Sequence, residues 1–222
     1  MSDRHQRAGL GRRLYDATWG RVFAAGYDRF MADTERAGMA ERRRGLIAGA
    51  RGRTVELGAG TGLNLGHYPD TVGELILTEP FPPMAKRLRE KAGARATVVE
   101  ATADDLPLAD GSADTVVCTL VLCTVDDLPA TLAEVARVLA PGGRLLFLEH
   151  VRSDDPRTAR WQDRLERPWR LFAHGCRCNR DTLAAIAGSP LEVESVEHGS
   201  IPNSPAITRP LIAGSAALPA RS

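Results

Sequence analysis

The 222-residue chain has no long apolar run. A membrane-spanning helix needs roughly 18 apolar residues in succession, and no stretch comes near that length. The opening residues, MSDRHQRAGLGRRLYD, are charged and lack the apolar middle of a secretory signal. These absences predict a cytoplasmic protein with no stable membrane anchor.

The sequence also lacks an excess of charge of one sign. It has 29 basic and 28 acidic residues, a formal net charge of +1, and no concentrated basic segment. Proteins that bind nucleic acids usually carry a basic patch or stripe that meets the phosphates. The sequence therefore predicts no nucleic-acid partner, and it leaves both a monomer and a homodimer open.

Cysteine is scarce, and its four positions match no metal motif. Cys118 and Cys123 lie in an apolar segment that should be buried, while Cys176 and Cys178 form a C-x-C pair. Zinc knuckles and redox dithiols typically use C-x-x-C spacing, which is absent. We therefore expect reduced, buried thiols and no bound metal.

What the chain does have is an alternation of strand and helix patterns from about residue 50 onward. Short apolar segments predict strands, and apolar residues at every third or fourth position predict helices. The expected strands lie within residues 53–60, 73–80, 96–108, 113–125, 144–151, 190–201 and 207–218. The expected helices lie within residues 27–50, 83–93, 126–143 and 155–175.

The helix expected within residues 126–143 has the plainest boundaries. Asp126 and Asp127 can cap its start, and Pro129 suits its first turn. Pro141 and the two glycines after it predict its end. Apolar residues at spacings of four and three define one buried face: Leu128, Leu132, Val135 and Leu139.

Strands that alternate with helices predict one α/β domain, with a parallel sheet that helices cover on both faces. We divide residues 1–222 into four parts. They are an N-terminal helical cap (1–50), a cofactor-binding core (51–151), a helical insert over the substrate site (152–188) and the last two strands (189–217).

A glycine-rich turn follows the first strand, in the segment VELGAGTGLNLG. Ligands of open α/β sheets bind beyond the carboxyl ends of the strands, which is where Gly58, Gly60 and Gly62 fall. The dinucleotide fingerprint G-x-G-x-x-G would need its third glycine at the position of Leu63. Leu63 and the acidic Glu56 before the turn therefore disfavour a pyrophosphate ligand and an NAD-dependent oxidoreductase.

An acidic residue ends the second strand. Glu79 lies 21 residues after Gly58, near the offset of about 20 residues expected of a carboxylate that binds a ribose diol. S-adenosylmethionine carries such a diol together with a cationic ammonium and sulfonium, and a carboxylate can accept hydrogen bonds from both ribose hydroxyls. The turn, Glu79 and the α/β alternation together favour this ligand.

From about Tyr27 to its end, the chain resembles the class I S-adenosylmethionine-dependent methyltransferases. The motifs that carry the resemblance are VELGAGTGLNL, LILTEP, ATADDLPLADGSADTVVCTLVLCTV and LAEVARVLAPGGRLLFLEHV. DGSADTVVCTLVLCTV, FLEHV and the later GCRCNRDT are similar to the alkyl-thiol methyltransferase subgroup. Ubiquinone and menaquinone methyltransferases match the earlier motifs. The resemblance implies a Rossmann-like, seven-stranded, mostly parallel sheet with an antiparallel last strand.

The resemblance also implies where S-adenosyl-L-methionine and its product, S-adenosyl-L-homocysteine, would bind. Asn64 would begin the helix after the turn, Glu79 would hold the ribose, and Tyr27 would help to close the pocket. The residues implied along the methionine part are Glu56, Gly58, Ala59, Gly60, Thr61 and Gly62. Those implied at the adenine are Pro80, Phe81, Met84, Thr102, Ala103 and Asp104, and those on the sulfonium side are Thr119 and Leu120.

Methyl transfer is an in-line displacement that needs an aligned nucleophile and a site without water. His150 follows the fifth strand with Glu149 beside it, and the two are our catalytic candidates, as a base or an orienting pair. Four residues of the insert are further candidates: His174, Cys176, Trp161 and Trp169. The two tryptophans fit a pocket wall or the buried stripe of a helix equally well.

The sequence thus favours a methyltransferase that acts on the sulfur, oxygen or nitrogen of a small molecule. A preference for a thiol rests on the subgroup resemblance alone. The alternative enzyme is a quinone-type or natural-product carbon or oxygen methyltransferase. The alternative outside enzymes is a partner subunit that binds the cofactor without turnover.

Overall fold

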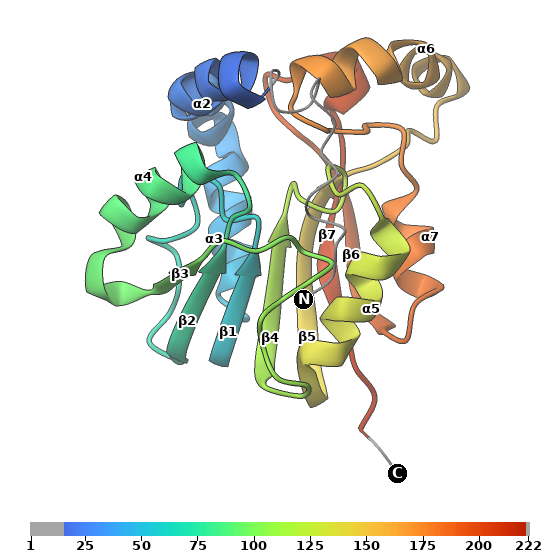
Figure 1. Ribbon diagram of the computed structural model, residues 1–222. Helices are drawn as coiled ribbons and strands as arrows, with labels where there is room; N and C mark the ends of the chain where they lie inside the picture. The colour runs from blue at the N-terminus through green and yellow to red at the C-terminus, as the bar shows by residue number, and fades with distance from the viewer. Residues whose placement is uncertain (1–15, 221–222) are drawn as a thin grey trace.

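The computed structural model describes residues 16–220 as one sheet with helices around it (Figure 1). The strand order is β3-β2-β1-β4-β5-β7-β6. The strands are β1 (Gly52–Leu57), β2 (Val72–Thr78), β3 (Thr97–Val99), β4 (Ala113–Thr119), β5 (Leu139–His150), β6 (Glu192–Ser200) and β7 (Pro210–Ala217). β7 runs antiparallel to β5 and β6, and the other neighbours are parallel. This confirms the predicted sheet.

Six α-helices and four short helical turns complete the described part of the chain. The helices are α2 (Arg21–Thr34), α3 (Ala40–Ile47), α4 (Pro82–Ala92), α5 (Leu128–Val138), α6 (Pro156–Phe172) and α7 (Thr182–Ala187). The turns are η2 (Asp16–Gly20), η3 (Glu35–Met39), η4 (Gly93–Arg95) and η5 (Ala206–Thr208). Residues 1–15 of the predicted N-terminal cap lie outside the described residues.

The two faces of the sheet are covered by different helices. Val116 of β4 packs in one large cluster with Val135 of α5 and Ile186 of α7. The next residue, Val117, points to the opposite face and packs against Ile47 of α3. Helices on both faces were predicted, and the alternation along β4 shows how the strand can be buried on both sides.

The start of α5 agrees with the prediction at only one of the two aspartates. Asp127 is the cap, and its carboxylate accepts a hydrogen bond of 3.0 Å from the Ala130 amide. The helix ends at Val138, because Leu139 has extended backbone and pairs with Ala113. The expectation that Leu139 continues the helical face is therefore wrong: it is buried at the start of β5.

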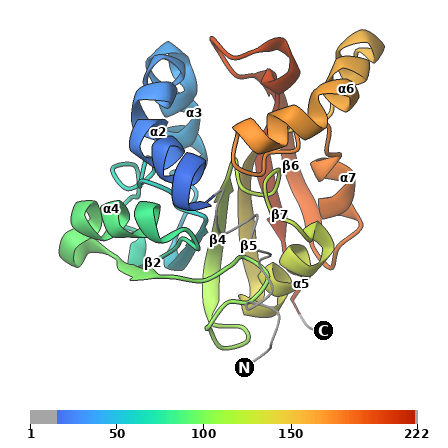
Figure 2. The ribbon, with the colours of Figure 1, turned by 45° about the horizontal axis from the view of Figure 1, so that its top comes forward.

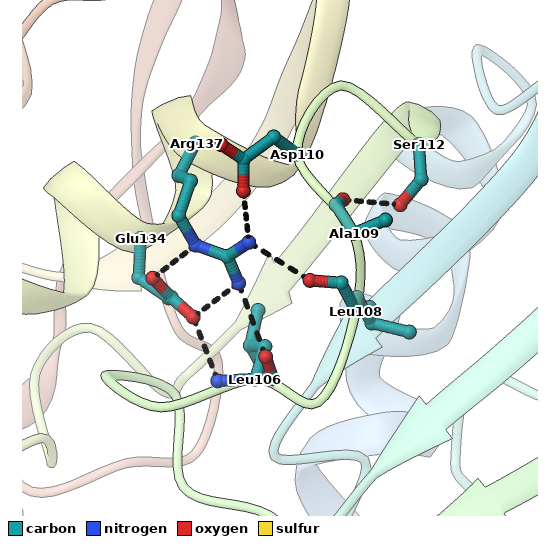
Figure 3. A network of polar contacts seen from close by, with 7 residues as sticks. All are labelled: Leu106, Leu108, Ala109, Asp110, Ser112, Glu134 and Arg137. Carbon is teal, nitrogen blue, oxygen red and sulfur yellow. Dashed lines mark hydrogen bonds and ion pairs between the residues drawn. The ribbon is translucent and has the colours of Figure 1, made fainter.

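The loop between β3 and β4 is tied to α5 by one arginine (Figure 3). The Arg137 guanidinium donates to the carbonyl oxygens of Leu106 and Leu108 at 3.0 and 2.8 Å, and to Glu134 and Asp110. Glu134 in turn accepts from the Leu106 amide at 2.7 Å. This network fixes the loop that directly follows the segment predicted to lie at the adenine.

Helices α2 and α6 lie together over the end of the sheet where β4 and β5 finish (Figures 1 and 2). The Trp19 indole donates to the Phe172 carbonyl oxygen at 2.9 Å, and the rings of Phe30 and Phe172 are 6.4 Å apart. None of the helices described for residues 16–220 has the length and apolar character needed to cross a membrane.

Gln162 of α6 joins the insert to the sheet. It is fully buried, and its two amide N–H groups are shared among the carbonyl oxygens of Val151, Cys178 and Ile207, which lie 2.8–3.1 Å from the amide nitrogen. Its amide oxygen accepts from the Ser153 nitrogen at 2.9 Å. One side chain therefore satisfies main-chain groups from three segments that lack a regular partner there.

We expect Gln162→Leu to lower the free energy of unfolding by about 3 kcal/mol, because it leaves several buried polar groups unpaired. Urea denaturation at constant pH measures the change. Arg157→Leu, at an exposed site of the same helix, is the matched control and should change it by less than about 0.5 kcal/mol. Equal stabilities for the two variants would contradict the role given to Gln162.

Candidate active site

Of the three glycines in the turn after β1, two pack against side chains and one faces open space. Gly58, Gly60 and Gly62 all have positive φ, at 55°, 58° and 77°, which favours glycine. A Cβ on Gly58 would lie 2.9 Å from Val121, and one on Gly62 would lie 2.9 Å from Leu88. A Cβ on Gly60 would meet nothing closer than 4.0 Å. Gly60 is therefore the position where a ligand can approach the main chain.

No helix begins at Asn64, contrary to the expectation from the sequence. Residues 60–67 form successive turns, in which Leu65 and His67 donate to the carbonyl oxygens of Gly62 and Asn64 at 3.3 and 2.8 Å. The positive φ at Gly62 interrupts helical geometry at the point where a helix would start. Asn64 is almost fully buried, and its side chain points into the protein.

Asn64 belongs to a buried polar network at the ends of β1 and β4. Its amide nitrogen donates to Glu56 and to the Thr119 hydroxyl, both at 2.8 Å. The Arg43 guanidinium donates to the Asn64 amide oxygen at 3.0 Å and to Thr119 at 2.9 Å. Arg43 also pairs with Glu35 at 2.9 Å. The predicted ligand residues Glu56, Asn64 and Thr119 thus hold one another in place.

Burial controls the ionisation of this network. It raises the pKa of Glu56, while hydrogen bonds from Tyr68 and Asn64 and the positive charge of Arg43 act in the opposite direction. Tyr68 donates to Glu56 at 2.6 Å, and burial followed by the Glu56 charge raises its own pKa. Burial raises the pKa of Tyr27 to about 12, against the opposing charge of Arg43. Both phenols therefore stay neutral near pH 7.

Arg43 was not among the residues predicted at the site; it stands in the charged run ERRRG. A signal was present, because Met39 and Ile47 lie four residues before and after it and both are fully buried. An arginine on the apolar stripe of a helix needs a buried partner. Glu35, one turn further back in η3, supplies that partner.

Glu79 lies at the carboxyl end of β2, as predicted, with 5% of its surface exposed. One carboxylate oxygen accepts from the Gly60 amide and the other from the Phe81 amide, each at 2.9 Å. Burial raises its pKa to about 7, although these two hydrogen bonds oppose the shift. Each oxygen keeps a second lone pair, so the carboxylate can also accept from two ribose hydroxyls.

Thr102, one of the residues predicted at the adenine, carries a buried polar atom without a partner. The Thr102 hydroxyl is buried and has no hydrogen-bond partner among residues 16–220. The Met84 sulfur lies 4.0 Å from the Cβ position of Gly60. Ala103 is half-buried, while Asp104 and Pro80 are exposed. An adenine that accepts from Thr102 would remove the unpaired group, so this edge fits S-adenosylmethionine.

Helix α2 packs beside the glycine turn and α4. Thr61 donates to the Asp28 carboxylate, and Arg87 donates to the Ala24 carbonyl oxygen at 2.7 Å. The His174 ring lies against Phe23 and Phe81, with ring centres 5.7 and 4.8 Å away. His174 from the insert therefore packs next to a residue predicted to contact the adenine.

Glu149 does not lie free beside a reacting group. It is fully buried, and its carboxylate accepts hydrogen bonds from the amides of Val121, Leu122 and Cys123 at 2.9, 2.9 and 3.2 Å. These residues form the turn after β4, which leaves the sheet at Leu120, where φ is 59°. These hydrogen bonds show that Glu149 positions this turn. A catalytic role for Glu149 stays a prediction.

His150 meets two cysteines from distant segments. Its Nδ1 lies 3.4 Å from the Cys176 sulfur and 3.6 Å from the Cys123 sulfur, and the two sulfurs are 3.9 Å apart. The neighbouring thiol and imidazole lower the pKa of Cys176, and the Cys176 charge raises the pKa of His150 against the effect of burial. Cys176 and His150 were predicted near the substrate, whereas Cys123 was expected to be buried, in the core or at the cofactor pocket.

The remaining candidates divide between core and surface. Cys118 is buried in the core of the sheet. Cys178 belongs to a smaller buried cluster with Cys123, Cys176 and Ile207. Trp169 packs against the same cluster, while Trp161 is 54% exposed. Only Trp169 of the two tryptophans therefore faces the interior.

We expect Arg43→Met to lower the free energy of unfolding by about 3 kcal/mol, because the buried Asn64 and Thr119 and the partly buried Glu35 lose their common donor. Arg44→Met is the matched control: its guanidinium side chain is 59% exposed in a surface pair with Glu41. The control should change stability by less than about 0.5 kcal/mol. Thermal and urea unfolding compare the two, and similar values would show that the network is not stabilising.

Comparisons with known proteins agree with this geometry. A family model described as a methyltransferase domain matches residues 55–147. Human thiol S-methyltransferase TMT1A is 34% identical over 191 residues, which cover 79% of this chain and 78% of that protein. Demethylmenaquinone methyltransferase of Deinococcus radiodurans is 35% identical over 135 residues, which cover 58% of this chain and 53% of that protein.

A solved structure supports the fold over most of the chain. It is an S-adenosylmethionine-dependent methyltransferase of Thermotoga maritima, described as a possible histamine N-methyltransferase. The TM-score is 0.67 at 20% identity, and the match covers 90% of this chain and 97% of that one. Together with the similarity to TMT1A, these findings show that the chain belongs to the class I S-adenosylmethionine-dependent methyltransferases.

Proposed function

We propose that this methyltransferase transfers the methyl group of S-adenosylmethionine to the sulfur of a small thiol. The observation that carries the proposal is the similarity to a thiol S-methyltransferase over 79% of the chain. The half-buried His150 beside two cysteines supports it, because this group lies at the end of β5 next to the predicted sulfonium side of the site. The cytoplasmic location expected from the sequence stays a prediction.

The cofactor residues have distinct roles in this proposal. Bound S-adenosylmethionine supplies an electrophilic methyl group on a sulfonium. Glu79 accepts from the ribose hydroxyls, the main chain at Gly60 lies along the methionine part, and Thr102 reads the adenine edge. Tyr27, which is neutral and close to the charges of Glu79 and Arg43, closes the crevice from α2. These contacts hold the methyl donor, so the residues of the insert must align the methyl acceptor.

On the acceptor side, the chain must favour the thiolate form of the substrate and exclude water. An ordinary thiol has a pKa near 8.5, so a modest stabilisation of the thiolate is enough near neutral pH. His150 is the group placed to provide it. We propose that helices α2 and α6, which meet where Phe30 contacts Phe172, limit the access of water on the acceptor side.

The accepting atom can be identified by offering the enzyme matched acceptors. We expect methyl transfer from isotopically labelled S-adenosylmethionine to 2-mercaptoethanol and other alkyl thiols, and little transfer to matched alcohols, phenols or amines. Product analysis by mass spectrometry measures all acceptors together. The similarity to demethylmenaquinone methyltransferase makes a demethylated quinol the necessary competitor. Preferential methylation of the quinol carbon would reject the thiol in favour of the quinone-type alternative.

The affinity for S-adenosylhomocysteine should depend on pH through the ionisation of Glu79. Because its pKa is raised to about 7 and the ribose needs the ionised carboxylate, affinity for S-adenosylhomocysteine should increase from pH 6 to pH 8. The gain is at most about tenfold per pH unit below the pKa. Glu79→Gln should weaken binding at pH 8 by roughly 1–3 kcal/mol and flatten this rise.

Calorimetric titration across this pH range checks both effects. Glu74→Gln is the matched control on the same strand, because its carboxylate is about half exposed in a pair with Arg53. It should reproduce the wild-type profile. Glu56 also raises the pKa of Glu79, but its own carboxylate is held by Asn64 and Tyr68. A rise with pH that persists in Glu79→Gln would assign the titration to another group.

A further inference from the structure

Three segments far apart in the sequence bring soft ligand atoms together. Cys123 comes from the turn after β4, His150 from the end of β5 and Cys176 from the loop after α6. Their sulfur and nitrogen atoms all lie within 4.8 Å of one another. The two cysteines are at most 4% exposed. A search for C-x-x-C spacing could not find these three residues, because that spacing identifies only ligands that are close together in the sequence.

The spacing of these atoms matches that of ligands around a tetrahedral metal ion. Zinc lies about 2.3 Å from sulfur and about 2.0–2.1 Å from nitrogen, which places tetrahedral ligand atoms about 3.5–3.8 Å apart. The observed separations are 3.4 and 3.6 Å from Nδ1 to the sulfurs and 3.9 Å between the sulfurs. A metal ion would fit with shifts of a few tenths of an ångström.

The surroundings of the group also suit a soft divalent ion. Two thiolates balance the charge of a divalent ion, so the loaded site would bury no net charge. Ile207, Trp169 and Ala173 form an apolar shell around the sulfurs. The main chain of Cys123 is held on both sides, because its amide donates to Glu149 and its carbonyl oxygen accepts from Arg177 at 2.8 Å. Such outer contacts orient metal ligands.

We propose that Cys123, His150 and Cys176 bind one zinc ion and that the acceptor thiol binds to it at the fourth position. Among residues 16–220, no fourth cysteine, histidine or carboxylate joins the group. Sites with three protein ligands are typical of zinc that also binds a substrate, whereas structural zinc usually has four. The S–H bond of the acceptor breaks on binding, its proton goes to solvent, and the thiolate sulfur donates an electron pair to the metal.

This inference rests on the proposed thiol acceptor, and it explains how His150 favours the thiolate. The metal group lies close to the cofactor residues, since Val121, two residues before Cys123, packs against Gly58 of the glycine turn, and His174, two residues before Cys176, packs against Phe81. A thiolate is also the soft ligand that zinc binds well. The bound sulfur is the atom that the proposed reaction methylates.

The first experiment tests the metal. The reduced, chelator-treated full-length protein is titrated with zinc chloride by calorimetry, and we expect one equivalent to bind. Cys176→Ala, Cys123→Ala and His150→Ala should each lose that equivalent. Cys178→Ala is the matched control: this cysteine is equally buried and two residues from Cys176, but it lies outside the group. Binding of S-adenosylhomocysteine shows that each variant is folded.

A measurement on the unchanged protein covers the case in which the ligand variants fail to fold. Cobalt(II) bound in the same group should give the thiolate-to-metal charge-transfer band and the intense visible bands of a tetrahedral site. Wild-type protein that binds neither ion, or Cys176→Ala that binds zinc as well as Cys178→Ala does, overturns the proposal. The group would then consist of thiol and imidazole hydrogen bonds alone.

The second experiment tests the thiol. Adding 2-mercaptoethanol to the cobalt-loaded protein should shift the visible bands with saturation, and ethylene glycol, its oxygen analogue, should not. Unshifted bands overturn the fourth-ligand assignment. Removal of zinc should lower thiol methylation at least about tenfold, with recovery on adding zinc. Full thiol methylation without metal rejects this inference and leaves the proposed function standing. If no thiol is methylated by either form, the proposed function fails, and with it the thiol ligand, while the zinc titration still decides the metal site.

Discussion

The buried guanidinium of Arg43 is the interaction on which the ligand-binding end of the molecule depends. It joins the helical segment before the sheet to Asn64 in the glycine turn and to Thr119 at the end of β4. Because a buried charge is tolerated only when its donors are satisfied, this single residue fixes the relative positions of three segments. Glu35 supplies the opposite charge, so the network needs no ligand to be complete.

In the glycine turn, some glycines pack against neighbouring side chains and one is open to a ligand. Gly58 and Gly62 are required by contacts with Val121 and Leu88, so two of the three glycines serve the protein's own packing. Gly60 alone leaves space, and Glu79 holds its amide from the neighbouring strand. The carboxylate therefore shapes the turn and remains able to accept from a ribose. A glycine pattern identifies such a turn, but only the neighbouring side chains show which glycine a ligand can reach.

Much of the fold could be predicted from the sequence, because strand and helix periods are local properties. The alternation predicted a parallel sheet with helices on both faces, while the seven strands and the antiparallel last strand were implied by the family resemblance. Errors came where tertiary contacts decide: Leu139 joins a strand because it pairs with Ala113, and the turn at Asn64 never becomes a helix. Side-chain contacts at the site were harder to predict: the sequence places Glu149 beside His150, but its hydrogen-bond partners are three amides 26–28 positions away.

The electrostatics of the site explain why a cationic ligand suits it better than a dinucleotide. Burial raises the pKa of Glu56 and Glu79, and Glu56 adds to the shift at Glu79. The positive charge of Arg43 opposes the rise in the pKa of Glu56. No arginine of the described residues is among the causes that act on the pKa of Glu79. The hydrogen bonds that Glu79 accepts within residues 16–220 come from neutral backbone amides, so they bring no positive charge to its ionised form. An ammonium and a sulfonium bring that charge, whereas a pyrophosphate would add two negative charges beside two buried carboxyl groups and increase the cost of ionising them.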